Sequence, residues 1–246
     1  MGDLGDQRRA VLALIAAATA ARLGFAAAMG LGVDESYMVA AGRVWSWGYF
    51  DHPPAAWWLS RGSAWLFRTE AAVVVRLPFV ALSAWTLWLS ARLGAAAAGP
   101  RAGFWTAAVV ALAPMLGVTA GTWVLPDGPM LCALAGAALC LVRALDADGR
   151  DAWRLWSGAG VCAGLAMFSK YSAVLPIAGA GLFLVAHPRH RRWLARPHPW
   201  AAAALALAGF APVIAWNAAN GWASFAFQGA RAAAAAFRPL AAQHFE

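Results

Sequence analysis

Long apolar runs separated by short charged segments are the feature that most constrains this chain. Runs of about 18 or more apolar residues are long enough to cross a bilayer as helices. Of the 246 residues, 62% are hydrophobic and only 12% are charged, whereas soluble domains carry about 25% charged residues. This composition excludes an ordinary soluble fold, and the sequence predicts an all-α, polytopic transmembrane helical bundle.

Hydropathy divides the chain into about seven predicted spans within a single transmembrane domain that covers residues 1–246. The fifth and sixth spans are short, and the sequence leaves open whether they tilt against neighbouring helices or are shielded by protein. The first run follows Arg8 and Arg9 and is long for a signal peptide, so we expect an uncleaved helix. The predicted spans are 10–31, 73–93, 102–120, 129–145, 155–169, 171–186 and 200–216.

The net charge of +8 does not indicate nucleic-acid binding, because the arginines cluster at the ends of predicted spans. A cytoplasmic N-terminus places 11 of the 19 Lys and Arg residues in short cytoplasmic segments, as the positive-inside rule requires. The three cysteines, Cys132, Cys140 and Cys162, lie inside apolar runs and are expected to pack as small core residues. We therefore expect a multi-pass protein of the inner (plasma) membrane, in contact with membrane lipids.

This orientation leaves one long non-cytoplasmic loop, residues 32–72. The loop contains "MVAAGRVWSWGYF" and "AAWWLSRGSAWLF", in which tryptophans alternate with a few arginines. Tryptophan favours the boundary between lipid and water, and amphipathic helices lie in that boundary. We expect two interfacial helices here.

The acidic residues outside the cytoplasmic segments gather on the non-cytoplasmic side. They are Asp34, Glu35, Asp51, Glu70 and Asp127, and all but Glu70 stand next to predicted helix ends. A carboxylate at the membrane boundary has a high desolvation free energy, so it is normally solvated, paired with a cation or part of a functional site. Asp34 alone could simply cap the next helix, and Asp127 in "LPDGP" could belong to a turn. Their clustering on one side indicates a functional site.

Lys170 is the sole lysine beside 18 arginines, and it stands between two apolar runs. An ammonium group suits a phosphate as a point-charge partner, although a snorkelling lysine at a span end remains an alternative. Arg76 is a second candidate cation on the same side. His52 follows Asp51 and could share a metal with carboxylates or merely form hydrogen bonds. Arg22, inside the first span, either snorkels or pairs within the bundle.

Six motifs occur in order along the chain: a first helix that ends in "DE" with a tyrosine, then "GYFDHPP", "VRLP", "LPDGP", "SKYSAVL" and "WNAANGWASFAFQ". In this order they resemble the polytopic glycosyltransferases of the protein O-mannosyltransferase and aminoarabinose-transferase type. These belong to the GT-C superfamily, which also includes lipopolysaccharide-core galacturonosyltransferases. The resemblance covers about residues 10–230.

The resemblance implies an enzyme that transfers a sugar, with inversion, from a polyprenyl-phosphate carrier to a protein, a lipopolysaccharide or another glycan of the cell envelope. The reaction would take place on the non-cytoplasmic face. It implies the following roles: Asp34, Glu35 and Asp127 as catalytic acids or bases, Lys170, Arg76 and His52 at the donor phosphate, Asp51 at a metal, and Tyr37, Asn217 and Gln228 at the substrates.

Two departures from the family pattern bear on these expectations. Gln228 stands where aminoarabinose transferases have a metal-binding histidine, so the use of a divalent metal is left open and no other cofactor is expected. The family is also typically about twice as long, which suggests that this chain corresponds to its N-terminal part. The alternative function is that of a non-enzymatic membrane protein, either a transporter or a truncated, inactive fragment of such a transferase.

Overall fold

A computed structural model of the chain describes residues 2–236 and is built from helices, with no strand in that range. The predicted all-α class is confirmed. The helices are α1 (Gly2–Ala28), α2 (Val33–Ala41), α3 (Ala55–Phe67), α4 (Ala72–Ala98), α5 (Pro100–Leu112), η1 (Pro114–Thr119), α6 (Ala120–Thr122), α7 (Asp127–Ala144), α8 (Gly149–Ser169), η2 (Tyr171–Ala173), α9 (Val174–Ala186), η3 (Arg191–Ala195), α10 (Pro197–Ala219) and α11 (Ala223–Ala236).

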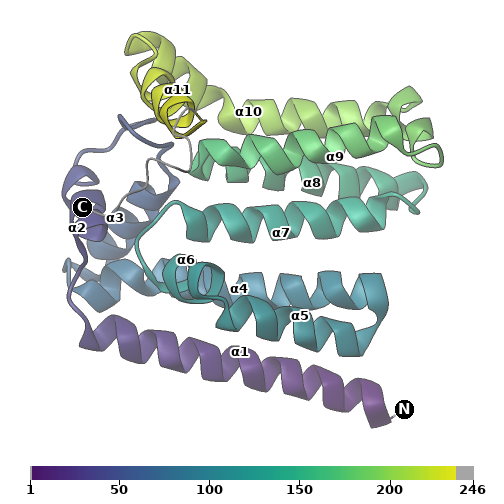
Figure 1. The fold of residues 1–246 in the computed structure, drawn as a ribbon, viewed down its shortest axis with the longest axis horizontal. Coiled ribbons are helices and arrows are strands. Elements are labelled where there is room, and N and C mark those ends of the chain that lie inside the picture. Colours follow the sequence, from purple (N-terminus) through teal and green to yellow (C-terminus); the bar gives the residue numbers. More distant parts are fainter. Residues whose placement is uncertain (1, 237–246) are drawn as a thin grey trace.

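The long helices lie side by side along the longest axis of the molecule, and successive ones run in opposite directions (Figure 1). Helices α1, α4, α7 and α10 are each long and apolar enough to cross a membrane, and the bent pair of α5 with η1 and α6 would add a fifth crossing. The chain is therefore a multi-pass membrane protein by length and composition. The count of seven crossings stays a prediction.

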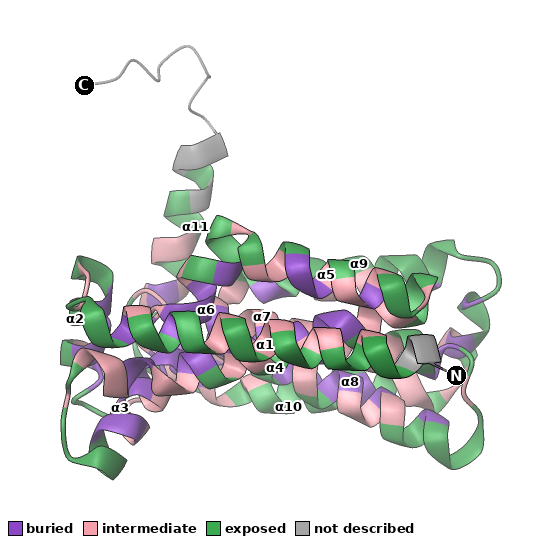
Figure 2. Cartoon of the chain, turned by 90° about the horizontal axis from the view of Figure 1, so that it is seen from below, coloured by how far each residue is buried: buried purple, intermediate pink, exposed green. Residues whose placement is uncertain are grey.

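Helices α2, α3 and α11 lie together at one end of the bundle, which we call the α2–α3 end, while the turn between α9 and α10 lies at the opposite, α9–α10 end (Figure 1). Buried side chains of α2 and α3 pack against α4 in one hydrophobic core, in which Trp57 and Phe79 are both fully buried. Exposed residues cover much of α1 (Figure 2). The segment 32–72 is thus folded onto the bundle through its helices.

Small residues allow α8 and α10 to approach until their backbones touch. A Cβ atom added at Gly160 would lie 2.3 Å from the carbonyl oxygen of Ala202, and one added at Gly164 would lie 3.4 Å from Cα of Gly209. Close backbone approach through Gly and Ala is the usual way in which membrane helices gain packing energy. This contact fixes the position of α8 relative to α10, and the C-terminal ends of both helices contribute to the site described below.

The segment predicted as the third span is not one straight helix. It bends by 78° between α5 and the following Pro114–Thr122 segment, because Pro114 has no N–H to donate and breaks the ladder. Arg22 of α1 compensates for the break: its Nε donates to the carbonyl of Gly117 at 2.8 Å and Nη2 to that of Ala111 at 3.3 Å. Arg22 is 7% exposed, so it pairs inside the bundle and does not snorkel.

Replacing Arg22 by methionine should destabilise the protein by about 2 kcal/mol, because a buried and a partly buried carbonyl would lose their donor. Thermal unfolding in detergent measures the change, and Arg8→Met, an exposed arginine of the same helix, is the control. Equal melting temperatures for both variants would contradict the role of Arg22 in stabilising the break at Pro114.

Candidate active site

The alternation of helix directions brings the predicted site residues to the α2–α3 end. The C-terminal ends of α1, α8 and α10 meet the N-terminal ends of α4 and α7 there (Figure 1). Three clusters at this end hold the charged residues of the predicted site, and they centre on Glu35, Asp127 and Asp51. The fifth acid, Glu70, pairs separately with Arg43 and Arg61. The sequence predicted the shared side, and the structure adds which residues contact one another.

Glu35 and Arg76 form a buried, bidentate ion pair. Arg76 Nε lies 2.8 Å from Oε1 and Nη2 lies 2.5 Å from Oε2, and both side chains are 1% exposed. Arg76 also donates to the backbone carbonyls of Ala26, Met29 and Gly30. One guanidinium thus ties the end of α1 and the start of α4 to α2.

The Glu35 carboxylate accepts two further backbone N–H groups, from Gly32 and from Val124, each at 3.0 Å. Burial raises the pKa of Glu35, but the Arg76 guanidinium and these two N–H groups outweigh it, so the pKa lies below its ordinary value. Glu35 is therefore ionised and fully hydrogen-bonded. It fixes α2 against the loop that leads to Asp127.

Asp34 stands beside this pair and is exposed. It makes no hydrogen bond or ion pair with any residue in the described range 2–236. The alternative that Asp34 caps α2 is wrong, because the helix begins after Gly32 and Glu35 accepts the Gly32 N–H. Its neighbour Glu35 thus holds the helix end, and the Asp34 carboxylate is free to meet a ligand.

Asp127 and Lys170 form the second cluster. Lys170 Nζ lies 2.8 Å from Oδ1 and 2.9 Å from Oδ2 of Asp127, and the two side chains are 28% and 30% exposed. Asp127 is the first residue of α7 and Lys170 follows the last residue of α8. The only lysine and the acid of "LPDGP" are thus joined at an accessible position, where a ligand anion could reach the ammonium group.

Asp51 is the centre of the third cluster. The Tyr37 hydroxyl donates to Oδ1 at 3.1 Å, Gln228 Nε2 donates to the Asp51 carbonyl, and His52 Nδ1 lies 3.2 Å from Oδ2. Burial raises the pKa of Asp51, but His52 and the Tyr37 hydroxyl outweigh it, so the pKa lies below its ordinary value. Burial and the Asp51 charge raise the pKa of Tyr37 to about 12, which keeps this hydroxyl a donor.

These side chains do not form a metal-binding set. Within residues 2–236, no three His, Cys, Asp or Glu side chains are grouped so that they could share an ion. Asp51 has only His52 beside it, and its Oδ1 already accepts from Tyr37. A tightly held metal normally takes at least three protein ligands, so we assign no step to one.

Asn217 lies in a buried network that joins α10 to α11. Its side-chain amide donates to the Tyr171 hydroxyl at 3.3 Å, and its Oδ1 accepts the Phe225 N–H. The Tyr171 hydroxyl in turn lies 2.7 Å from Ser224 Oγ. Sequence reasoning missed Tyr171 and Ser224. Tyr171 follows Lys170 directly, and the chain has only three tyrosines, which was an available signal.

Replacing Tyr37 by phenylalanine should raise the pKa of Asp51 toward its ordinary value and cost about 1 kcal/mol at neutral pH. Because the folded-state pKa of Asp51 is depressed, its stabilising effect is present at neutral pH and is lost as the pH falls through the folded-state value. The melting temperatures of the two proteins should differ at pH 7, and this difference should begin to shrink as the pH falls below the unfolded value of Asp51, about 3.9. A difference that does not change with pH would contradict this role.

A comparison with protein-family models matches residues 51–216 to the dolichyl-phosphate-mannose-protein mannosyltransferase family. No curated protein and no solved structure matches the chain. The matched range contains Asp51, His52, Arg76, Asp127 and Lys170, so it joins parts of all three clusters. The match confirms the resemblance to GT-C glycosyltransferases. The chain belongs to the dolichyl-phosphate-mannose-protein mannosyltransferase family, a family of membrane glycosyltransferases of the GT-C type.

Proposed function

We propose that this protein transfers a sugar from a polyprenyl-phosphate carrier to an acceptor in the cell envelope, with inversion at the anomeric carbon. The observation that supports this most directly is the pairing of Lys170 with Asp127 at the α2–α3 end. A partly exposed ammonium paired with one carboxylate, at the end that also carries the exposed Asp34, suits a reaction in which a phosphate departs and a hydroxyl loses its proton. Membership of the family supports the reaction class.

In the proposed mechanism, Lys170 stabilises the departing phosphate. As the bond between the anomeric carbon and the phosphate oxygen breaks, negative charge grows on that oxygen, and a cation held nearby lowers the barrier. Asp127 accepts from Lys170 through both carboxylate oxygens and so keeps the ammonium oriented before the donor binds. A phosphate oxygen can then join this contact without a large movement of the lysine.

Asp34 is the proposed general base. It takes the proton of the acceptor hydroxyl while that oxygen forms a bond to the anomeric carbon, on the side opposite to the departing phosphate. Its exposure allows an acceptor to approach. Attack from the opposite side inverts the configuration and needs no covalent enzyme intermediate. The proton of the acceptor hydroxyl goes to the Asp34 carboxylate, which becomes neutral. The bond that breaks leaves one further negative charge on the carrier phosphate, so the total charge does not change.

Glu35 and Arg76 are proposed as positioning residues. Their atoms are all engaged with one another and with the backbone, so they act by holding Asp34 at a fixed separation from the loop before Asp127. Asp51, His52, Tyr37 and Gln228 are proposed to contact the substrates, and Asn217 to orient α11 beside them. We propose that this end faces the non-cytoplasmic side of the inner membrane.

Asp34→Asn should lower sugar transfer by about 10²- to 10⁴-fold, because a general base contributes that much. Membranes that contain the protein would be mixed with a polyprenyl-phosphate sugar and cell-envelope fractions, and the product detected by mass spectrometry. Asp148→Asn, an exposed carboxylate beside Arg196 at the opposite end, is the control. The anomeric coupling constant of the product, measured by NMR, reports inversion.

Retained transfer in Asp34→Asn would contradict the assigned base, and retention of configuration would contradict the mechanism. A protein that transfers no sugar but moves a solute across vesicles would instead be a transporter. A transporter places ionisable groups along a path near the bilayer midplane. Arg22, the buried cation within α1, is bound to the carbonyls of a broken helix, which supports a structural role.

A further inference from the structure

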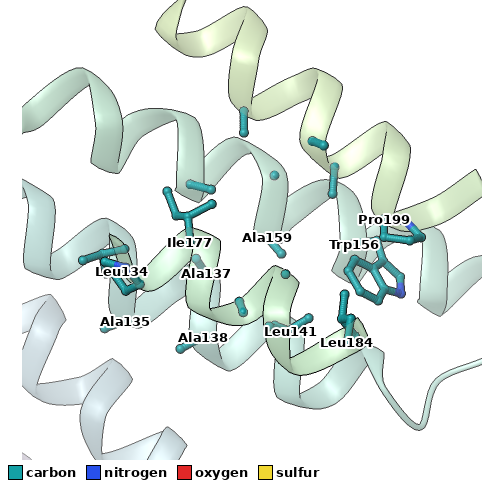
Figure 3. A pocket seen from close by; sticks show the side chains of 18 of the residues that line it. Leu134, Ala135, Ala137, Ala138, Leu141, Trp156, Ala159, Ile177, Leu184 and Pro199 are labelled. Atoms are coloured by element: carbon teal, nitrogen blue, oxygen red, sulfur yellow. The ribbon is translucent and has the colours of Figure 1, made fainter. Parts of the chain in front are cut away.

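A large apolar cavity lies between α7, α8, α9 and α10, away from the charged clusters. Its volume is about 680 Å³, within the range of sites that hold whole ligands. Leu134, Leu141, Ile177 and Leu184 are among the side chains around it, and its lining is nearly all carbon (Figure 3). Helix α9 packs mainly against the short helices η2 and η3 at its two ends, which leaves this space beneath it.

The cavity extends to the α9–α10 end, where arginines gather. Arg191 Nε donates at 2.9 Å to the carbonyl of Val185, a residue of the cavity lining. Arg192 follows it in the sequence, and its Nη2 lies 3.5 Å from the carbonyl oxygen of Leu145. Neither arginine forms an ion pair with a carboxylate in the described part of the chain. By contrast, Arg189 and Arg196 are paired with Asp146 and Asp148. Arg191, held beside the cavity lining through Val185, and the adjacent Arg192 are thus without a carboxylate partner in the described part of the chain.

We propose that this cavity is a binding site for an anionic phospholipid. An acyl chain fills the apolar space beside α9, and the lipid phosphate lies against the guanidinium groups of Arg191 and Arg192. Basic pockets between membrane helices on the cytoplasmic side commonly take anionic lipid headgroups, and this end is the one that the distribution of arginines predicts to be cytoplasmic. The site is separate from the proposed sugar-transfer site, which lies at the other end of the bundle.

The test is retention of a defined lipid by the purified protein. The protein would be exchanged into detergent with palmitoyl-oleoyl phosphatidylglycerol or with the phosphatidylcholine of the same chains, and the bound lipid counted by native mass spectrometry. One phosphatidylglycerol should be retained, roughly tenfold more tightly than phosphatidylcholine, since each basic residue near the phosphate contributes to binding. Equal retention of both lipids would overturn the headgroup assignment.

Two pairs of variants locate the site. Arg191→Gln with Arg192→Gln should reduce retention about tenfold, whereas Arg150→Gln with Arg154→Gln, exposed arginines of the same end, should not. Ala180→Phe fills the cavity from α9 and should also abolish retention, whereas Ala178→Phe, on the same helix but outside the lining, should leave it intact. Size-exclusion elution shows that each variant is folded. Undiminished retention in Ala180→Phe, or loss in Ala178→Phe alone, would overturn the proposal.

Discussion

Lys170→Met should reduce sugar transfer by about 10²- to 10³-fold, the loss expected when one charge-stabilising group is removed from an active site. The variant keeps the length of the side chain and removes its charge. Asp127 would lose the partner that lies 2.8 Å and 2.9 Å from its two oxygens. The transfer rate at saturating polyprenyl-phosphate sugar, measured in membranes, is the readout, because the proposed contact strengthens as the phosphate departs.

Lys170→Arg separates a need for charge from a need for a lysine. A guanidinium pairs with a carboxylate through two parallel bonds and so favours Asp127 over a single phosphate oxygen; we expect this variant to stay at least tenfold below the wild-type rate. Asp127→Asn should lower the rate as well, since the lysine loses its orientation. Arg150→Gln, at the opposite end, is the control. A Lys170→Met rate within twofold of the wild type would exclude Lys170 from the reaction.

Glu35→Gln should destabilise the protein by about 3 to 5 kcal/mol, because it leaves the buried Arg76 guanidinium without its counter-charge. Arg76→Met should cost a similar amount, since Glu35 would then be a buried carboxylate with only two N–H donors. The double variant Glu35→Leu with Arg76→Met should be less destabilised than either single variant, as no buried charge remains. Unfolding in detergent measures all three. A double variant as unstable as the sum would contradict the pairing.

The pH dependence of the same pair has a definite sign. The pKa of Glu35 is lowered in the folded protein, so its contribution to stability is present above the unfolded value, about 4.3, and is lost as the pH falls through the folded value. Arg76→Met removes the main cause of that lowering. The stability difference between wild type and Arg76→Met should therefore be largest near neutral pH and shrink on acidification, as melting temperatures at several pH values would show.

The sequence was sufficient for the class of the fold and for the gathering of the predicted site residues at one end of the bundle. Apolar length and arginine distribution depend on local composition, and the bilayer restricts apolar segments to helices, because no backbone group can stay unpaired in lipid. Helices α4, α7 and α10 accordingly occupy predicted spans. The bend at Pro114 was harder to foresee, since membrane helices often tolerate proline when a neighbour supplies the missing contacts. Here Arg22, from another helix, does so.

In the candidate site, too, some features follow from the sequence and others depend on tertiary contacts. The residue types, their order and their common end follow from the sequence, because antiparallel helices return their ends alternately to the same side. Which acid meets which cation does not follow, since Glu35 and Arg76 are 41 residues apart and Asp127 and Lys170 are 43 apart. Five acids and several cations at one end allow many pairings with similar Coulomb energies. Close packing, such as the backbone contact between α8 and α10, selects one.

The sequence by itself therefore determined that the protein is helical, lies in a membrane and collects five of its acids and its lysine at one end. Only the tertiary structure distinguished Glu35, buried and saturated with donors, from its neighbour Asp34, exposed and free. The two residues are adjacent and chemically alike, so no local pattern separates them. Their difference arises because α2 is turned so that one carboxylate faces Arg76 and Val124 while the other faces outward, and that rotation is set by packing against α3 and α4.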